Sequence, residues 1–286
     1  MIKAIRKKFS TSEPFPFQLI FKDTKSPQSE LPDHLHDWYE IVYIHSGSGM
    51  FFIDSSFYEM TAGDVFLIPR NTIHRAMPQR SDPITSTILF FSSSLLPDIS
   101  LGEPFSLQAI FEQIRRSKQF RISLEAAEQD HIQSLIEDIR YEIESLQQGF
   151  HYASMLTLHR IILSLSRLQR STYREPSSLT TTGAPWMKEL LAYIELNYDD
   201  SLSLSSLSQR AHVSPEHFSR VFKQMTGMPL TDYIHTKRIL KAQQLLKDTN
   251  LAIEVLAEHC GFQSMPHFHR IFKKVTGQTP AAYRKR

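Results

Sequence analysis

The sequence predicts two domains of different class. The N-terminal part is expected to be a β-sandwich or β-barrel with flanking helices, and the C-terminal part an all-α domain with tandem helix-turn-helix motifs. Over residues 15–92, short runs rich in Phe, Tyr, Ile and Val alternate with turn signals, which is typical of sandwiches and barrels. Helical periodicity begins near residue 124. A fourteen-residue segment then occurs twice, at an offset of fifty residues.

Composition narrows the possible classes of protein. A length of 286 residues suits two domains. No run reaches the roughly 18–20 apolar residues of a membrane helix, and no signal peptide is expected. The single cysteine, Cys260, predicts a reducing, cytoplasmic location. The strings GxxxxGK and GxGxxG do not occur, which argues against the common nucleotide-binding enzymes.

The N-terminal half is expected to hold a sheet domain over 1–102 and a helical dimerisation or coupling segment over 103–170. One helix is predicted to begin near Ser123 and to end near Gly149. The next helix has apolar residues on more than one stripe, among them Ile161, Ile162 and Leu165. It is therefore expected to pack on two surfaces. The second surface is either a partner subunit or this chain's own core.

A flexible linker is predicted over 171–185, because Ser, Thr, Pro and Gly dominate there. The charge is unequal on its two sides. Residues 1–170 hold 17 Lys and Arg against 20 Asp and Glu, whereas 186–286 hold 14 against 9. The basic C-terminal part indicates a polyanion partner, although a solvated charged face would have the same composition.

The repeated segment has the pattern of a capped helix. Ser214–Gly227 and Ser264–Gly277 agree at eight of fourteen positions, and each begins with a potential N-cap and ends with a potential C-cap. One face is apolar, at Phe218, Val221, Phe222 and Met225 and at Phe268, Ile271, Phe272 and Val275. The other is polar and basic, at His217, Arg220, Lys223 and Gln224 and at His269, Arg270, Lys273 and Lys274. Short helices predicted near 203–211 and 252–260 complete two helix-turn-helix patterns.

The two copies are joined by a predicted helix over 229–247. A helix of that length spans about 30 Å, and successive major grooves on one face of DNA lie about 34 Å apart. One chain could therefore place both copies in neighbouring grooves of double-stranded DNA.

Residues 186–286 resemble the DNA-binding domain of the AraC-type transcription factors over their whole length. The matching strings include Ser214–Gly227, Ala257 through Gly261-Phe262, and Thr279 through Arg284. The resemblance implies that Glu216, Ser219 and Arg220, and Pro266, His269 and Arg270, lie where family members reach base edges. Because the Pro266 side chain has no hydrogen-bond donor or acceptor, readout of bases by the second copy is expected to rest on His267, His269 and Arg270. The family also implies a homodimer, RNA polymerase as a partner, activation, and a carbohydrate-like effector.

The N-terminal domain resembles a cupin β-barrel. The string His34-Leu-His36-Asp-Trp-Tyr-Glu40, with Gly47 later, and the string Gly63 to Pro69, with His74 later, match the two cupin motifs. In metal cupins, the positions of His34, His36, Glu40 and His74 hold a divalent ion. Related sensor domains often keep this skeleton without a metal, in which case the four residues are core polar groups or effector contacts. Asn71 and Pro78 depart from the pattern at positions that are not ligands. Trp38 shares the strand parity of His36 and Glu40 and should also point inward as an effector contact.

Two functions remain open at this point. The first is a ligand-responsive transcription regulator without enzymatic activity, and the tandem helix-turn-helix favours it. The second is a metal-dependent cupin enzyme with an accessory DNA-binding module. A DNA-repair methyl acceptor would need a reactive cysteine, but Cys260 is expected on the buried side of a helix.

Overall fold

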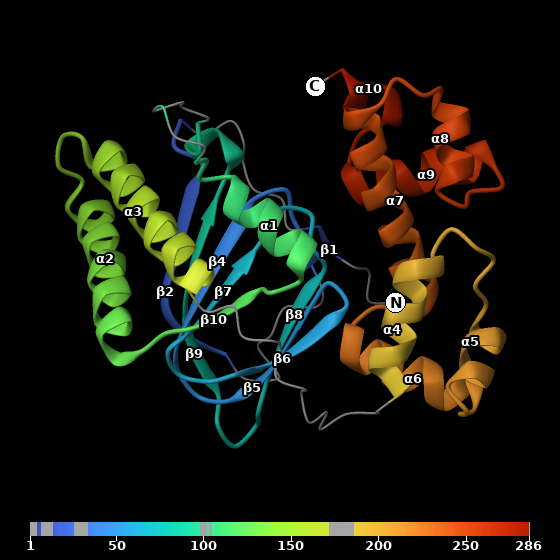
Figure 1. Cartoon of the computed structure of the whole chain (residues 1–286), viewed down its shortest axis with the longest axis horizontal. Coiled ribbons are helices and arrows are strands. Elements are labelled where there is room, and N and C mark those ends of the chain that lie inside the picture. Colours follow the sequence, from blue (N-terminus) through green and yellow to red (C-terminus); the bar gives the residue numbers. More distant parts are fainter. Residues whose placement is uncertain are drawn as a thin grey trace. The chain divides into compact units, whose positions relative to one another are not determined.

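The computed structural model describes residues 5–6, 14–25, 34–97, 102, 105–171 and 186–285. The chain divides into two compact units, one over residues 7–180 and the other over 181–286 together with 1–6. A sheet-rich N-terminal domain precedes a helical C-terminal domain, as predicted (Figure 1). No helix in the described ranges has both the length and the apolar character needed to cross a lipid bilayer.

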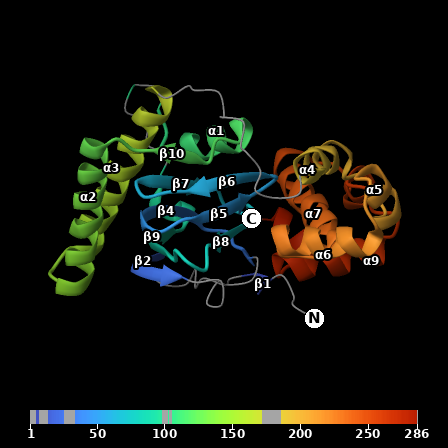
Figure 2. The same cartoon turned by 90° about the horizontal axis from the view of Figure 1, so that it is seen from below.

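The N-terminal strands form two antiparallel sheets (Figure 2). One has the order β3 (His34–Leu35), β8 (His74–Pro78), β5 (Gly49–Ile53), β6 (Ser56–Met60). The other has the order β10 (Arg121–Ser123), β7 (Asp64–Ile68), β4 (Tyr39–Ser46), β9 (Ile84–Phe91), β2 (Phe17–Lys25). A two-residue strand, β1 (Ile5–Arg6), precedes these. The predicted cupin-like, sheet-rich domain is confirmed, and within the described residues its two sheets do not close into a barrel.

Successive side chains of β4 point to opposite faces of its sheet, one toward the other sheet and one toward the helices. On the outer face, the Tyr39 ring lies 4.3 Å from the Phe111 ring of α1 (Ala109–Ser117). The Tyr43 hydroxyl accepts a 2.6 Å hydrogen bond from Gln133 of α2 (Ala126–Ser145). Glu40 lies on the opposite face, between the two sheets. The alternation of this strand therefore places one carboxylate inside a core that is otherwise rich in aromatic rings.

Helices α2 and α3 (Phe150–Ser171) form a hairpin (Figures 1 and 2). Helix α2 begins later than predicted, because Glu125 is its N-cap in a capping box with Glu128, whereas Ser123 ends β10 and donates a 2.7 Å hydrogen bond to Asp64. The helix ends at Ser145, with Leu146 as its left-handed C-cap, rather than at Gly149. Strand β10 is a further correction, since its segment was predicted to be helical.

The second apolar stripe of α3 belongs to this chain's own core. Ile161, Ile162 and Leu165 are all 0% exposed and pack in the same cluster as the sheets. Of the two alternatives for this stripe, the intramolecular one is correct, and these three residues are not free to contact a partner subunit.

The C-terminal domain consists of seven helices in its described residues. In chain order they are α4 (Trp186–Asn197), α5 (Leu204–Arg210), α6 (Pro215–Thr226), α7 (Leu230–Asp248), α8 (Ile253–His259), α9 (Met265–Thr276) and α10 (Pro280–Arg284). They match the predicted pattern of two helix-turn-helix motifs on a connecting helix. The predicted linker, 171–185, lies outside the described residues except for Ser171, which ends α3.

Candidate functional site

Helices α6 and α9 are built alike, with one difference at the N-cap. The Ser214 side chain accepts a hydrogen bond from the His217 backbone N–H, and Pro215 occupies the first turn of α6. Ser264 has the N-cap position of α9, but its side chain makes no capping hydrogen bond. Gly227 and Gly277 end the two helices with φ of +78° and +79°. Local sequence thus sets the ends of both helices, and the first helix is the better capped.

The predicted apolar stripes are turned inward. Phe218, Phe222, Phe268 and Phe272 are 0% exposed. As a consequence, ten of the eleven predicted DNA-binding side chains are exposed: Glu216, His217, Ser219, Arg220, Lys223 and Gln224 on α6, and His269, Arg270, Lys273 and Lys274 on α9. A face of this composition can donate hydrogen bonds to phosphates and to base edges.

His267 is the exception among the predicted DNA-binding residues. Its ring packs edge-on against His235 of α7 at 4.9 Å and against Phe262 at 5.9 Å. Its Nε2 atom is buried without a hydrogen-bond partner among the described residues. His267 therefore lies in an aromatic cluster at the first turn of α9. His217, its counterpart in the first copy, is exposed and accepts a 3.2 Å hydrogen bond from Arg220.

The connector α7 links the two motifs through polar contacts that the sequence did not indicate. Arg238 donates hydrogen bonds of 2.7 Å to the backbone carbonyls of Tyr198 and Asp200. Lys237 pairs with Glu195 of α4 at 2.5 Å, and Lys274 of α9 pairs with Asp232 of α7 at 3.1 Å. With 19 residues, α7 is about 28 Å long at 1.5 Å per residue. Both helix-turn-helix motifs are thus held on one rigid connector.

In the N-terminal domain, three of the predicted polar residues converge between the sheets. The Glu40 Oε2 atom lies 2.9 Å from His36 Nε2 and 3.0 Å from His74 Nε2. All three residues are 1–3% exposed. His36 precedes β4, which carries Glu40, and His74 begins β8 of the other sheet. We call these three residues the sensor triad.

The hydrogen bonds of the triad define the chemistry at its centre. Nδ1 of His36 lies 2.9 Å from the Trp38 carbonyl, and Nδ1 of His74 lies 2.9 Å from the Thr72 carbonyl. A carbonyl only accepts, so both Nδ1 atoms must donate their protons. In the neutral tautomers, both Nε2 lone pairs then face a carboxylate oxygen. The cluster therefore requires a shared proton or a cation at its centre.

The pKa shifts favour an ionised Glu40 carboxylate and a neutral His36 imidazole. Burial lowers the pKa of His36. For Glu40, burial alone would raise the pKa, but the neighbouring imidazoles, His74 foremost, hold it well below its usual range. The three donor atoms lie within 4.8 Å of one another, and imidazoles held through Nδ1 are the usual form of histidine ligands. This donor set fits a divalent metal ion.

Two further predicted sensor residues are placed differently. Trp38 is 2% exposed but lies in the bend before β4 rather than on a strand. His34 lies in β3, where its backbone pairs with that of His74, but its side chain is outside what the structure describes. Asn71 adopts a left-handed φ of +56°, which explains how it can stand where cupins usually have glycine. The residues that sequence reasoning missed, His235 and Asp232, belong to no motif and become recognisable only through their contacts.

Two family models match this chain. The model described as "AraC-like ligand binding domain" matches residues 17–170, and the model described as "Helix-turn-helix domain" matches residues 207–286. The HTH-type transcriptional activator RhaS of Pectobacterium carotovorum is 24% identical over 266 residues, covering 92% of this chain and 90% of RhaS. The bifunctional transcriptional activator/DNA repair enzyme AdaA of Bacillus subtilis is 37% identical over 111 residues, 39% of this chain and 53% of AdaA. Among solved structures, wild-type ToxT of Vibrio cholerae with a bound unsaturated fatty acid has a TM-score of 0.36 at 17% identity, covering 97% of this chain and 96% of ToxT.

Proposed function

The chain belongs to the AraC family of transcription regulators, and on that premise we propose that it is a sequence-specific activator controlled by a small-molecule effector. The observation that carries the proposal is the pair of exposed, basic helices, α6 and α9, on one connector of about 28 Å. That length is close to the spacing of successive major grooves. The experiment is selection of bound duplexes from random DNA. Recovery of a two-part motif with about one helical turn between its parts is expected, and recovery of random sequence would contradict the proposal.

Base readout in this proposal rests chiefly on Arg220 and Arg270, which occupy equivalent exposed positions in the two copies. An arginine can donate two hydrogen bonds to guanine O6 and N7. Glu216, Ser219 and His269 supplement them, while Lys223, Lys273 and Gln224 suit phosphates. Lys274 also forms an ion pair with Asp232. His267 remains in the proposed set, but its position supports a role in holding α9 rather than direct contact with a base.

For the effector site, we propose the space between the two sheets around His36, Trp38, Glu40 and His74, with His34 beside them. Inward polar groups next to aromatic rings suit a carbohydrate-like molecule, which offers hydroxyls and apolar ring faces. The His36 ring, for example, meets the Phe90 ring edge-on at 5.4 Å. A screen of small polar metabolites for a rise in melting temperature of the full chain tests this. Glu40→Gln is expected to abolish any rise, and a rise that persists in this variant would place the effector elsewhere.

A divalent metal is the second candidate for the same site, because the triad needs a positive centre and presents two nitrogen donors and one oxygen donor. A bound ion would act there as a Lewis acid or as an anchor for an effector oxygen. Metal analysis of the purified chain, followed by a chelator, tests the candidate. One equivalent of metal that is lost in His74→Ala would support it. Metal-free protein that binds no added Zn²⁺, Mn²⁺ or Fe²⁺ would exclude it.

We further propose a homodimer, joined through the α2–α3 hairpin. Four large apolar side chains near the hairpin loop are 59–73% exposed: Tyr141, Leu146, Tyr152 and Leu156. We call them the hairpin patch. Helix α2 carries six acidic residues against one basic residue, whereas α3 carries three arginines and no acidic residue. In a two-fold pair, α2 of one copy can therefore face α3 of its partner with complementary charge. RNA polymerase is the expected further partner of an activator.

An enzymatic function is not favoured by the cysteine chemistry. AdaA is named a DNA repair enzyme, and a methyl acceptor needs a reactive thiolate. Cys260 is buried, and burial raises the pKa of its thiol to about 11. At neutral pH this thiol is protonated and enclosed, so Cys260 is a core residue of α8 and its following turn.

A further inference from the structure

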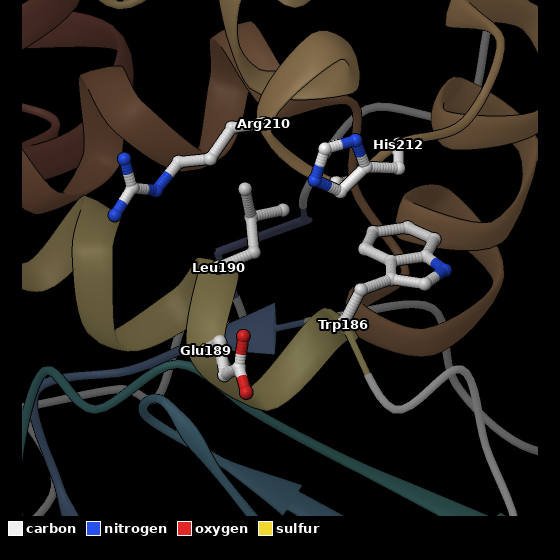
Figure 3. A pocket seen from close by; sticks show the side chains of 6 residues that line it. Trp186, Glu189, Leu190, Arg210 and His212 are labelled. Carbon is white, nitrogen blue, oxygen red and sulfur yellow. The ribbon is translucent and has the colours of Figure 1, made fainter.

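A hollow in the C-terminal domain is lined by none of the predicted DNA-binding residues. Its volume is about 350 Å³, within the size range of small-ligand sites. It is lined by Trp186, Glu189 and Leu190 of α4, by Arg210 at the end of α5, and by Ala211 and His212 of the turn that leads to α6. Figure 3 shows Trp186 and His212 on one side and Arg210 on the other, with Leu190 between them and Glu189 below Leu190 on α4.

Three polar side chains at this hollow have no polar partner within the described part of the fold. Among the described residues, the side chains of Glu189, Arg210 and His212 form no ion pair and no hydrogen bond. All three residues are exposed, so their polar atoms are accessible to a ligand. Arg210 is positioned by stacking, because its guanidinium lies 3.9 Å from the centre of the Tyr193 ring. That contact leaves its N–H groups free to bind an anion.

The apolar part of the hollow is rigid. The Trp186 ring stacks on Phe218 of α6, with centroids 5.2 Å apart and an interplanar angle of 24°. Leu190 is 2% exposed and is held in the core. His212 adopts a left-handed φ of +54°, which histidine tolerates better than most residues, and this conformation fixes where its side chain leaves the turn. The wall is therefore preorganised.

We propose that this hollow binds a small zwitterion with an apolar body, which is the chemistry of a free α-amino acid with a large apolar side chain. The ligand carboxylate would pair with Arg210 and His212, and its ammonium group with Glu189. Its side chain would cover Trp186 and Leu190. Only a ligand with both charges satisfies all three polar groups, since a simple carboxylate would leave Glu189 as a repulsive neighbour.

This site is separate from the sensor triad and depends on neither the effector nor the metal proposed there. An occupant would contact the α5–α6 turn and, through Trp186, the stack on Phe218. It would therefore rest against the elements that position α6. The inference adds a second ligand class to the molecule, acting at the DNA-binding domain itself.

The test uses the two tryptophans of the chain, Trp38 and Trp186. Indole N–H signals of the full chain are recorded by NMR, and Trp186→Phe assigns them. The probes are L-phenylalanine, 3-phenylpropionate, which lacks the ammonium group, and phenethylamine, which lacks the carboxylate. We expect L-phenylalanine to shift the Trp186 signal and not the Trp38 signal. Each analogue should bind about three- to fivefold more weakly, the effect of one exposed ion pair.

The variants identify the groups involved. In Glu189→Gln, L-phenylalanine should bind no better than 3-phenylpropionate, because the ammonium group has lost its partner. His212→Asn keeps a residue that tolerates the left-handed conformation and should weaken the carboxylate probes about threefold. Glu254→Gln, an exposed glutamate of α8, is the matched control and should change nothing. The proposal is overturned if no probe shifts Trp186 at about 10 mM, a concentration that detects even weak ligands. Equal binding of all three probes, or an equal effect of Glu254→Gln, would also overturn it.

Discussion

At the residue scale, the sensor triad places two imidazoles against one buried carboxylate. The segment just before β4 brings His36 to Glu40, and β8 brings His74 from the other sheet. Because backbone carbonyls hold both Nδ1 protons, the centre between the Nε2 atoms and Glu40 is short of positive charge. A carboxylate in such a place is retained only where something neutralises it. We therefore propose that the triad binds a proton, a metal ion or an effector group at its centre.

Arg220 is expected to determine sequence preference. Arg220→Ala should weaken binding to the selected site by about 1–3 kcal/mol and relax the preference at one half-site. Lys223→Ala is the matched change one turn along α6. It should weaken all duplexes alike and reduce the slope of log affinity against log salt by about one. Fluorescence anisotropy at several salt concentrations measures both. A uniform loss in Arg220→Ala would identify Arg220 as a phosphate contact.

His235 is expected to make stability depend on pH. Burial, aided by His267 and Arg238, lowers the pKa of His235 from 6.5 to about 4, although Asp232 opposes the shift and Lys274 adds to it. Between these values the unfolded chain binds more protons, so its contribution is complete above pH 6.5 and is lost as the pH falls towards 4. Because the ring is half-buried, the loss between pH 7 and pH 5 is discounted to about 1 kcal/mol.

Urea denaturation at the two pH values checks this prediction. His235→Gln should reduce the pH-dependent difference by about 1 kcal/mol, leaving the part due to other buried histidines such as His36, whereas the same change at exposed His259 should leave the difference intact. A pH dependence that is identical in wild type and His235→Gln would show that other groups are responsible.

At the element scale, local sequence patterns were sufficient to predict the helices of the C-terminal domain. The stripe and cap residues of α6 and α9 lie within each helix, so one sequence pattern predicts both helices and their inner faces. The three residues of β10 are too few for a periodic pattern, and this strand forms because β7 offers an open edge. The separation of the two sheets, the cluster around His267 and the hollow beside Trp186 depend on contacts between distant segments. No spacing along the sequence reports such contacts.

The turn between α8 and α9 is expected to tolerate no side chain at Gly261. Its φ is +78°, and a Cβ atom there would lie 2.3 Å from the Asp199 carbonyl oxygen. That loop cannot easily move, because Arg238 holds the neighbouring carbonyls of Tyr198 and Asp200. Gly261→Ala should therefore lower the free energy of unfolding by about 3 kcal/mol or more, combining left-handed strain with a steric clash.

Gly277 provides the control for this change. Its φ is +79°, but nothing lies within 4 Å of a Cβ atom there, so Gly277→Ala should cost only the left-handed strain, about 1 kcal/mol. Urea denaturation of both variants gives the comparison. Equal losses would show that the contact with Asp199 is relieved by movement of the loop.

At the scale of the whole molecule, sensing and DNA reading lie in different compact units. An effector can control the second unit only by favouring one arrangement of the chain over another. A dimer supplies such an arrangement, because tethering one DNA-binding domain raises the effective concentration of its partner at a neighbouring half-site. The burial of Ile161, Ile162 and Leu165 removes them from this role. The exposed hairpin patch takes their place as the proposed contact.

Leu156→Asp is expected to separate the dimer without unfolding the chain. Leu156 is 59% exposed, so the monomer loses little. In the dimer, however, a new carboxylate would be buried near the partner's acidic α2. Sedimentation over a range of concentrations should show a monomer with an unchanged circular dichroism spectrum. Affinity for DNA with two full sites should fall about a hundredfold or more, the effect of a lost tether, while affinity for a single site should stay the same.

Leu196→Asp, at an 81% exposed leucine of α4, is the matched control and should remain dimeric, and Ile162→Asp should unfold the N-terminal domain. A folded Leu156→Asp protein that still dimerises as wild type would exclude the hairpin patch as the interface, and effector control would then have to act within one chain.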